Sequence, residues 1–297
     1  MGAGSEAIWA DERAGDTLTR LAVRRRSSSF RPNKNLIAGA TIVLAIVLIA
    51  LLAPLFAPHG PLDTDYNARF VPPSRDHWFG SDDLGRDILS RVIYGARIDL
   101  RVGIFSVLAP FFIGAFLGCV SGYYGGKIDT AVMRTVDVVQ AFPFLILIIA
   151  IVAVLGPGLT NMYIAVGIVA WVTYARLLRG EILVAKHREY VEAAQSMGAH
   201  DLRVIGRHIL PNVITSSIVY AMSDIILYIV LAASLSYLGL GARPPEPEWG
   251  AMITAARTFW AQAWWMSVFP GLAIVVTGVG FSLLGDGLAD ALRKGRG

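Results

Sequence analysis

Six apolar segments with almost no charged residues constrain this chain more than any other feature of its sequence. A membrane-spanning helix needs about 20 mainly apolar residues, and each segment is close to that length. Backbone polar groups in the hydrocarbon core must be satisfied within their own element, so we expect each segment to form a helix. The segments are residues 36–57, 102–121, 138–156, 159–175, 213–240 and 263–285. The expected fold class is therefore an all-α membrane protein with six transmembrane helices.

The overall composition supports a membrane protein and excludes several other classes. Only 16% of the 297 residues are charged, against about 25% in soluble domains. The net charge of +4 comes without a basic block interleaved with aromatic residues, so we expect contact with membrane lipid and not with nucleic acid. The single cysteine, Cys119, cannot form a disulfide framework or a thiolate cluster within this chain. The five histidines are scattered in sequence, and we predict no metal site and no cofactor.

The distribution of basic residues predicts the orientation of the spans. Lysine and arginine are enriched in cytoplasmic loops. With six spans, eighteen Lys and Arg residues fall on the side of the two termini and eight on the opposite side. We therefore expect both termini to be cytoplasmic.

The predicted organisation divides the chain at the ends of the apolar segments. A cytoplasmic tail, 1–35, precedes the first transmembrane helix, 36–57. An extracytoplasmic loop, 58–96, follows and leads into an interfacial amphipathic helix at 84–98. A five-helix core, 97–290, contains a long cytoplasmic loop, 181–211, and a short cytoplasmic tail, 291–297, ends the chain.

The cytoplasmic loop has the pattern of two short helices separated by a break. One apolar face would contain Val191, Ala194 and Met197, and Gly198 can adopt the left-handed conformation that ends a helix. A second apolar set follows, formed by Leu202, Ile205 and Ile209. Pro211 fits the first turn of the next span, where a missing N–H is tolerated. Periodicity alone is equally compatible with a helix pair that lies on the lipid surface.

The residue identities in this loop resemble a known family. Glu192-Ala193-Ala194, then Gly198, then Leu210-Pro211 is similar to the EAA loop of permease subunits in bacterial binding-protein-dependent ABC importers. His208 stands where the general pattern has isoleucine, but the peptide group commonly has Arg-His-Ile-Leu-Pro there. Residues 77–97, 244–250 and 285–292 resemble the C-type permeases of the dipeptide, oligopeptide and nickel group.

The resemblance implies a fold and a function. The expected fold is that of a type I ABC importer permease, in a prokaryotic cytoplasmic membrane. The chain would form half of the translocation pathway for di- or oligopeptides or a related solute, and would not itself be an enzyme. The implied partners are a homologous B-type permease subunit, cytoplasmic ABC ATPase subunits and an extracytoplasmic solute-binding protein. The residues implied in ATPase coupling are Glu192, Ala193, Ala194, Gly198, Leu210 and Pro211.

Two further features lie within the predicted spans. Gly114, Gly118 and Gly122 recur every four residues, which predicts a strip for close helix packing. Asp224 is an ionisable residue deep in a span and must face protein or water. It would either line the pathway and meet a peptide amine or a metal cation, or make a hydrogen bond between helices. Arg134 and Asp137 are spaced for a local ion pair.

Two other functions remain as alternatives. A proton- or ion-coupled secondary transporter would have paired charges or internal repeats near the middle of the membrane. A membrane-embedded enzyme would have a cluster of catalytic side chains within the spans, and the sequence contains none. The sequence does not assign the solute among dipeptides, oligopeptides, glutathione-like compounds and nickel.

Overall fold

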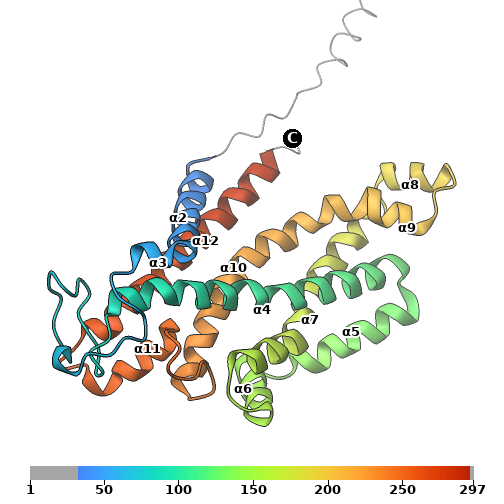
Figure 1. The fold of residues 1–297 in the computed structure, drawn as a ribbon. Helices are drawn as coiled ribbons and strands as arrows, with labels where there is room; N and C mark the ends of the chain where they lie inside the picture. Colours follow the sequence, from blue (N-terminus) through green and yellow to red (C-terminus); the bar gives the residue numbers. More distant parts are fainter. Residues whose placement is uncertain (1–32, 295–297) are drawn as a thin grey trace, which may run out of the picture.

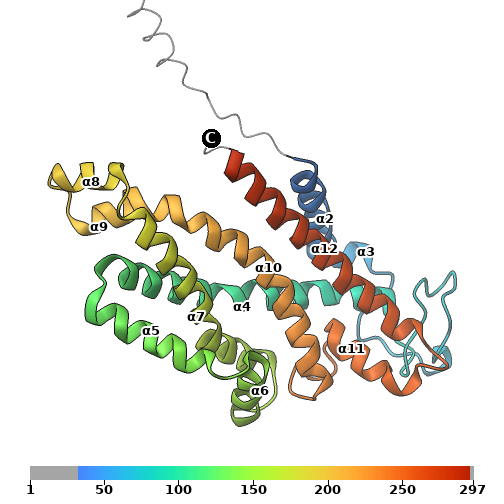
Figure 2. The ribbon, with the colours of Figure 1, turned by 180° about the vertical axis from the view of Figure 1, so that it is seen from behind.

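The structure, a computed structural model, describes residues 33–294 as an assembly of helices (Figures 1 and 2). Within that range the only strand-like pairing is an isolated bridge between Ser81 and Asp87. Residues 1–32 of the predicted tail at 1–35, and residues 295–297 of the tail at 291–297, lie outside the described residues. The part of the chain that can be described is therefore all-α, as the sequence predicts.

Five helices are long and apolar enough to cross a membrane. They are α2 (Lys34–Leu51), α4 (Ile88–Tyr124), α7 (Leu159–Ala185), α10 (Leu210–Tyr237) and α12 (Trp265–Lys294). Shorter elements connect them: α3 (Ala53–Phe56), η1 (Tyr66–Ala68), α8 (Glu189–Ser196), α9 (Asp201–Arg203), η2 (Val204–Ile209), α11 (Trp249–Ala256) and η3 (Arg257–Phe259). The long helices agree with five of the six predicted spans.

The third predicted span, 138–156, is a bent pair of helices. Helix α5 (Gly126–Gln140) and helix α6 (Phe144–Leu155) meet at an angle of 85°. Pro143 lies at this bend as the N-cap of α6, and proline disfavours the helical conformation of the residue before it. Helix α6 has only 12 residues, too few to cross a bilayer alone. The third predicted span is therefore not a single helix, and it adds a sixth span only where the bent α5–α6 pair is counted as one span.

The segment expected to form a separate interfacial helix belongs to a longer element. Residues 88–98 are the beginning of the 37-residue helix α4, which continues without a break through the second predicted span. Asp87 caps this helix by accepting a hydrogen bond from the backbone of Ser90. The predicted boundary at 96/97 thus falls inside a continuous helix.

Helix α4 packs along α7 through the predicted glycine strip. A Cβ atom at Gly114 would lie 2.5 Å from the carbonyl oxygen of Trp171, and one at Gly118 would lie 2.5 Å from that of Ala175. Gly122 faces Ile182 in the same way. These distances leave no room for a larger side chain, so the prediction of a packing strip is confirmed.

The described ends of the chain lie side by side. Helix α2 packs along α12, and the Asn33 side-chain amide donates to a carboxylate oxygen of Asp290 over 3.1 Å (Figure 1). The loop between α3 and α4, together with α11, lies at the opposite end of the molecule (Figures 1 and 2). There the Trp249 indole N–H donates to the carbonyl oxygen of Val92, and that of Trp265 donates to the carbonyl oxygen of Ser81, each over 3.0 Å. Two of the three segments that carry the family resemblance, 77–97 and 244–250, are therefore joined by a direct contact.

Candidate coupling surface and transmembrane cavity

Helix α8 is fixed to the end of the bundle by two buried side chains. Val191 and Ala194 are spaced three residues apart and are 0% and 2% exposed. Val191 belongs to an apolar cluster that includes Leu178 and Ile182 of α7. Two small anchors at helical spacing thus hold α8 close to α7, as the periodicity predicts.

Gly198 ends α8 in the conformation expected from the sequence. Its φ angle is +81°, in the left-handed region that favours glycine. The Gly198 N–H donates to the Gln195 carbonyl over 2.9 Å, and the Ala199 N–H donates to the Ala194 carbonyl over 3.1 Å. This pattern is a Schellman-type helix end. A Cβ atom at Gly198 would have open space around it, so the backbone conformation and not the packing requires glycine.

Two residues of the predicted apolar sets are exposed. Met197 is 81% exposed and Leu202 is 75% exposed. Met197 follows the last residue of α8, where the chain already turns toward Gly198. Val204 and Ile209 are buried in the same apolar cluster instead, and residues 204–209 between them form a π-helix with i→i+5 hydrogen bonds. A five-residue apolar spacing in the sequence is the signal that could have indicated this register.

The exposed surface of the loop is small and mixed in character. Glu192 and Ala193 are exposed on α8, next to Met197 and Gly198. A groove of about 830 Å³ is formed by the end of α7, the start of α8 and the start of α10, and includes Val184, Tyr190 and the exposed His187. The protruding apolar side chains and the adjacent groove are suited to bind another protein, since exposed apolar patches mark interaction surfaces.

The second half of the loop continues directly into a transmembrane helix. Residues Asp201–Tyr237 form one uninterrupted helical rod made of α9, η2 and α10. Leu210 is half-buried and Pro211 is exposed in the first turn of α10, where a missing N–H is tolerated. A displacement of η2 is therefore expected to move the N-terminal part of α10.

Polar contacts tie this loop to neighbouring helix ends. The Tyr123 hydroxyl donates to Asp201 over 2.8 Å, and the Lys186 ammonium donates to the Gly122 carbonyl over 3.0 Å. Arg179 forms a two-point pair with Asp129, one bond being 2.6 Å long. Such charge-assisted pairs fix direction as well as distance, so the loop is held in one orientation on the bundle.

Asp224 lies in α10 at a cavity within the bundle. Its side chain is only 5% exposed, and it accepts hydrogen bonds from the Tyr174 hydroxyl over 2.7 Å and the Tyr228 hydroxyl over 3.3 Å. The predicted interhelical hydrogen bond is thus present, made by Tyr174 of α7. No sequence signal pointed to Tyr174, which is 50 positions away.

The cavity beside Asp224 has a volume of about 380 Å³. Its walls come from the α5–α6 bend, from α7 and from α10, and include Gln140, Phe144, Thr173 and Tyr220. This volume is within the range of small-molecule sites, about 300–1,000 Å³. Asp224 therefore combines a structural hydrogen bond with a place at a cavity, so the two predicted roles do not exclude each other.

The local ion pair expected between Arg134 and Asp137 is replaced by a contact between helices. Asp137 accepts from the Arg176 guanidinium over 2.7 Å. Arg176 belongs to α7, and its side chain and that of Asp137 are about half exposed. Exposed pairs of this kind contribute at most about 1 kcal/mol, so this contact aligns the α5 and α7 ends with little effect on stability.

Comparison with known proteins assigns the chain to a family. A family model for the binding-protein-dependent transport system inner membrane component matches residues 114–296, and one for the N-terminal transmembrane domain of oligopeptide transport permease C matches residues 17–73. The fold resembles a chain of the MetNI methionine ABC transporter in inward-facing conformations, with a TM-score of 0.55 and 20% identity, covering 69% of this chain and 97% of the other. This likeness agrees with the type I ABC importer permease fold.

Curated relatives include three permeases. The dipeptide transport system permease protein DppC of Alkalihalophilus pseudofirmus is 42% identical, with 91% of this chain and 88% of the relative covered. The glutathione transport system permease protein GsiD of Pectobacterium atrosepticum is 47% identical, with 86% and 85% covered. The probable D,D-dipeptide transport system permease protein DdpC of Escherichia coli is 42% identical, with 86% of each chain covered. The chain is thus a member of the inner-membrane component family of binding-protein-dependent transport systems, and within it of the C-type permeases of ABC importers.

Proposed function

We propose that this chain forms half of the translocation pathway of an ATP-driven importer and docks on a separate cytoplasmic ATPase through α8 and the turn at Gly198. The observation that carries the proposal is the division of this loop into buried and exposed side chains. Val191 and Ala194 are buried and anchor the loop to the rest of the chain, while Glu192 and Ala193 remain exposed for a partner. Family membership supports the other partners, which are a homologous B-type permease subunit and an extracytoplasmic solute-binding protein.

The continuity of the α9–η2–α10 rod suggests how ATPase movement reaches the pathway. When the ATPase subunits close on nucleotide, they move the docked loop, and the rod moves with it. The same rod contains Asp224 beside the cavity. ATP would then shift the population between inward-facing and outward-facing states because the ATPase binds the two arrangements of the loop with different affinity. Phosphate chemistry stays in the partner subunits.

The solute that fits best is a peptide-like compound. The relatives' names refer to dipeptides, D,D-dipeptides and glutathione, which share amide bonds and ionised amino and carboxylate groups. Asp224 offers a carboxylate at the cavity wall, and a carboxylate pairs with an ammonium group. We infer that Asp224 contacts the amino group of the solute in passage.

The proposed location is a prokaryotic cytoplasmic membrane, crossed several times. The ends of α2 and α12 that lie side by side would face the cytoplasm together with α8, and the loop between α3 and α4 would face the outside. The bias of lysine and arginine toward the first of these sides supports this orientation.

The docking proposal is tested with two substitutions at one position. Gly198→Val should lose the ATPase, because a β-branched residue in the left-handed region costs roughly 1–2 kcal/mol and displaces the turn. Gly198→Asn should keep the ATPase, because asparagine tolerates this region and a Cβ atom meets no atom of this chain. The measurement is the amount of ATPase that co-purifies in mild detergent when the chain is co-expressed with its neighbouring genes.

Two outcomes would contradict this proposal, and a third would support it in another way. Equal ATPase recovery with wild type and Gly198→Val would remove α8 and its turn from the interface. Loss with both variants would instead mean that the ATPase approaches Gly198 too closely for any side chain, which supports docking at this turn. A wild-type chain that transports without any ATPase would favour the proton- or ion-coupled secondary transporter.

A further inference from the structure

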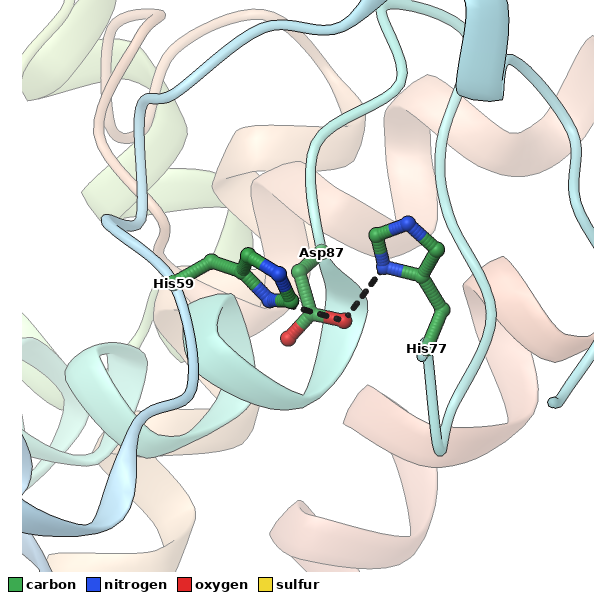
Figure 3. Close-up of side chains that lie close together, drawn as sticks. All are labelled: His59, His77 and Asp87. Carbon is green, nitrogen blue, oxygen red and sulfur yellow. Dashed lines mark hydrogen bonds and ion pairs between the residues drawn. The ribbon is translucent and has the colours of Figure 1, made fainter. Parts of the chain in front are cut away.

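Two histidines and one aspartate meet in the loop between α3 and α4, far from the coupling loop. His59 follows α3, His77 lies 18 residues further along the loop, and Asp87 is the N-cap of α4. Figure 3 shows the two imidazole rings on either side of the Asp87 carboxylate, both facing it. One candidate ligand atom from each residue lies within 4.8 Å of the other two.

The Asp87 carboxylate has contacts with both histidines in addition to the hydrogen bond that caps helix α4. The Nδ1 atom of His77 is 3.0 Å from Oδ1 of Asp87, which is a hydrogen bond. The Nδ1 atom of His59 is 3.9 Å from the same oxygen, too far for a hydrogen bond. The two ring centroids are 5.2 Å apart. Asp87 therefore caps α4 with one oxygen. Its other oxygen lies near both imidazole nitrogens and is hydrogen-bonded to that of His77.

A metal ion accounts for this convergence. Zinc binds imidazole nitrogen at about 2.0–2.1 Å and carboxylate oxygen at about 2.0–2.2 Å, which places tetrahedral ligand atoms about 3.4 Å apart. The two measured distances to Oδ1 lie on either side of that value. His59 has a side chain that is 43% exposed, so it can rotate to close the remaining gap and leaves an outer position open to water.

The surroundings orient the ligands as metal sites require. The second carboxylate oxygen of Asp87 accepts from the backbone N–H of Ser90 over 2.8 Å and from its hydroxyl over 2.7 Å. The Ser90 hydroxyl oxygen in turn accepts from the backbone N–H of His59 over 3.1 Å. One buried serine thus orients the Asp87 carboxylate, as outer-shell groups do around metals, and fixes the backbone of His59 beside it.

Neighbouring charges leave the carboxylate available. Arg91, one helical turn beyond Asp87, directs its guanidinium to the carbonyl oxygen of Pro61 over 3.0 Å and lies 3.8 Å from Asp82. Arg86 donates to Asp82 over 2.7 Å. Both arginines therefore interact with Asp82 and not with the oxygen of Asp87 that faces the histidines.

We propose that His59, His77 and Asp87 bind one divalent transition-metal ion of the zinc class. Two imidazole nitrogens and one carboxylate oxygen suit such an ion better than Mg²⁺ or Ca²⁺, which prefer oxygen ligands. The ion would fasten the residues after α3, the middle of the loop and the start of α4 to one another. The site is independent of the proposed ATPase docking and of the solute.

The test uses the full chain, purified in detergent without a polyhistidine tag and freed of metal with a chelator. Zinc chloride is titrated by calorimetry. Wild type should bind one equivalent, and His59→Ala and Asp87→Asn should each weaken binding by at least roughly tenfold, since even outer-shell changes cost 10-fold to 100-fold. Asparagine still caps a helix, so weaker binding by Asp87→Asn does not reflect loss of the α4 cap. His187→Ala, which removes an exposed histidine of the coupling loop, should bind as wild type.

A second measurement separates metal binding from a structural effect. Zinc should raise the apparent unfolding temperature of wild type and of His187→Ala, but not of His59→Ala, because a ligand that binds the folded state stabilises it. Absence of stoichiometric zinc binding by wild type would overturn the proposal. Equal affinity in wild type, His59→Ala and Asp87→Asn would overturn it as well, because the zinc would then bind elsewhere.

Discussion

The structural role of Asp224 and its proposed role in transport can be separated by replacing one carboxylate oxygen with an amide nitrogen. Asp224→Asn keeps an oxygen for the Tyr174 hydroxyl but removes the charge that would meet a solute amino group. We expect uptake of a peptide with a free amino group to fall roughly tenfold, the effect of losing a charged hydrogen bond of about 1.5 kcal/mol. Uptake of the same peptide with an acetylated amino group should change little. The measurement is uptake into proteoliposomes that contain the complete importer.

The same variant provides its own control. The ATPase activity of the assembled importer should be retained, because Asp224 lies in the span and away from the docking loop. If uptake of the free and acetylated peptides fell equally, Asp224 would serve the packing of α7 and α10 only. Asp224→Ala, which leaves the buried Tyr174 hydroxyl without this partner, should instead lower the thermal stability of the chain.

Sequence patterns correctly predicted the backbone conformation of single residues. They did not predict side-chain exposure that depends on helix register, or contacts between residues far apart in the chain. The left-handed conformation of Gly198 follows from its place after a short helix. The exposure of Met197 does not follow, because it depends on where α8 ends. The exposure of Leu202 does not follow either, because Val204 and Ile209 of the π-helix occupy the buried face. The approach of His59 and His77 to Asp87 depends on the path of the loop at residues 57–87, which no local spacing encodes.

At the scale of elements, the α4–α7 contact is sensitive to side-chain size. Gly118→Ala places a methyl group 2.5 Å from the Ala175 carbonyl oxygen, and such overpacking costs about 1–3 kcal/mol. Gly180→Ala is the matched control, because it is also on one of these two helices and a Cβ atom there meets no other atom within 4 Å. The temperature of aggregation in detergent should fall for Gly118→Ala. It should be unchanged or slightly higher for Gly180→Ala, since alanine favours the helix.

Equal aggregation temperatures for the two variants would show that α4 and α7 can separate without cost. Such a result would contradict the close packing of the glycine strip. A lower temperature for Gly180→Ala alone would place that surface against another element or subunit and would require a different arrangement of α7.

The apolar segments predicted the long helices because the bilayer leaves little choice of secondary structure. What they did not predict is where helices continue or bend. Helix α4 extends well before its apolar part, held by the Asp87 cap and by the Trp249 contact to Val92. The third segment bends at Pro143 although its hydropathy is continuous. Hydropathy measures burial in lipid, whereas caps, prolines and loop contacts set the ends of helices.

At the scale of the whole molecule, apolar side chains cover the outside of the helices. Phe112 and Phe116 of α4, Val154 of α6 and Val275 of α12 are each more than half exposed. On a soluble protein this surface would cause aggregation. A bilayer would cover such a surface with lipid, and the proposed importer would cover part of it with a second permease subunit.

The orientation of the molecule is tested by chemical labelling from one side. Cys119 is buried and is the single cysteine of the chain, so Cys119→Ala provides a background for introduced thiols. Trp78→Cys is placed in the loop between α3 and α4, and Met197→Cys at the end of α8; the replaced side chains are 66% and 81% exposed. A membrane-impermeant maleimide should label Trp78→Cys in intact spheroplasts. It should label Met197→Cys only after the membrane is disrupted.

The reverse pattern would place the histidine and aspartate cluster in the cytoplasm and the EAA segment outside. That result would be incompatible with docking of a cytoplasmic ATPase on α8, whatever the outcome of the Gly198 variants. It would also contradict the charge distribution, because eighteen lysines and arginines would then lie on the outer side and eight on the inner side. The labelling experiment therefore tests the importer model through the direction of the chain alone, without any partner or solute.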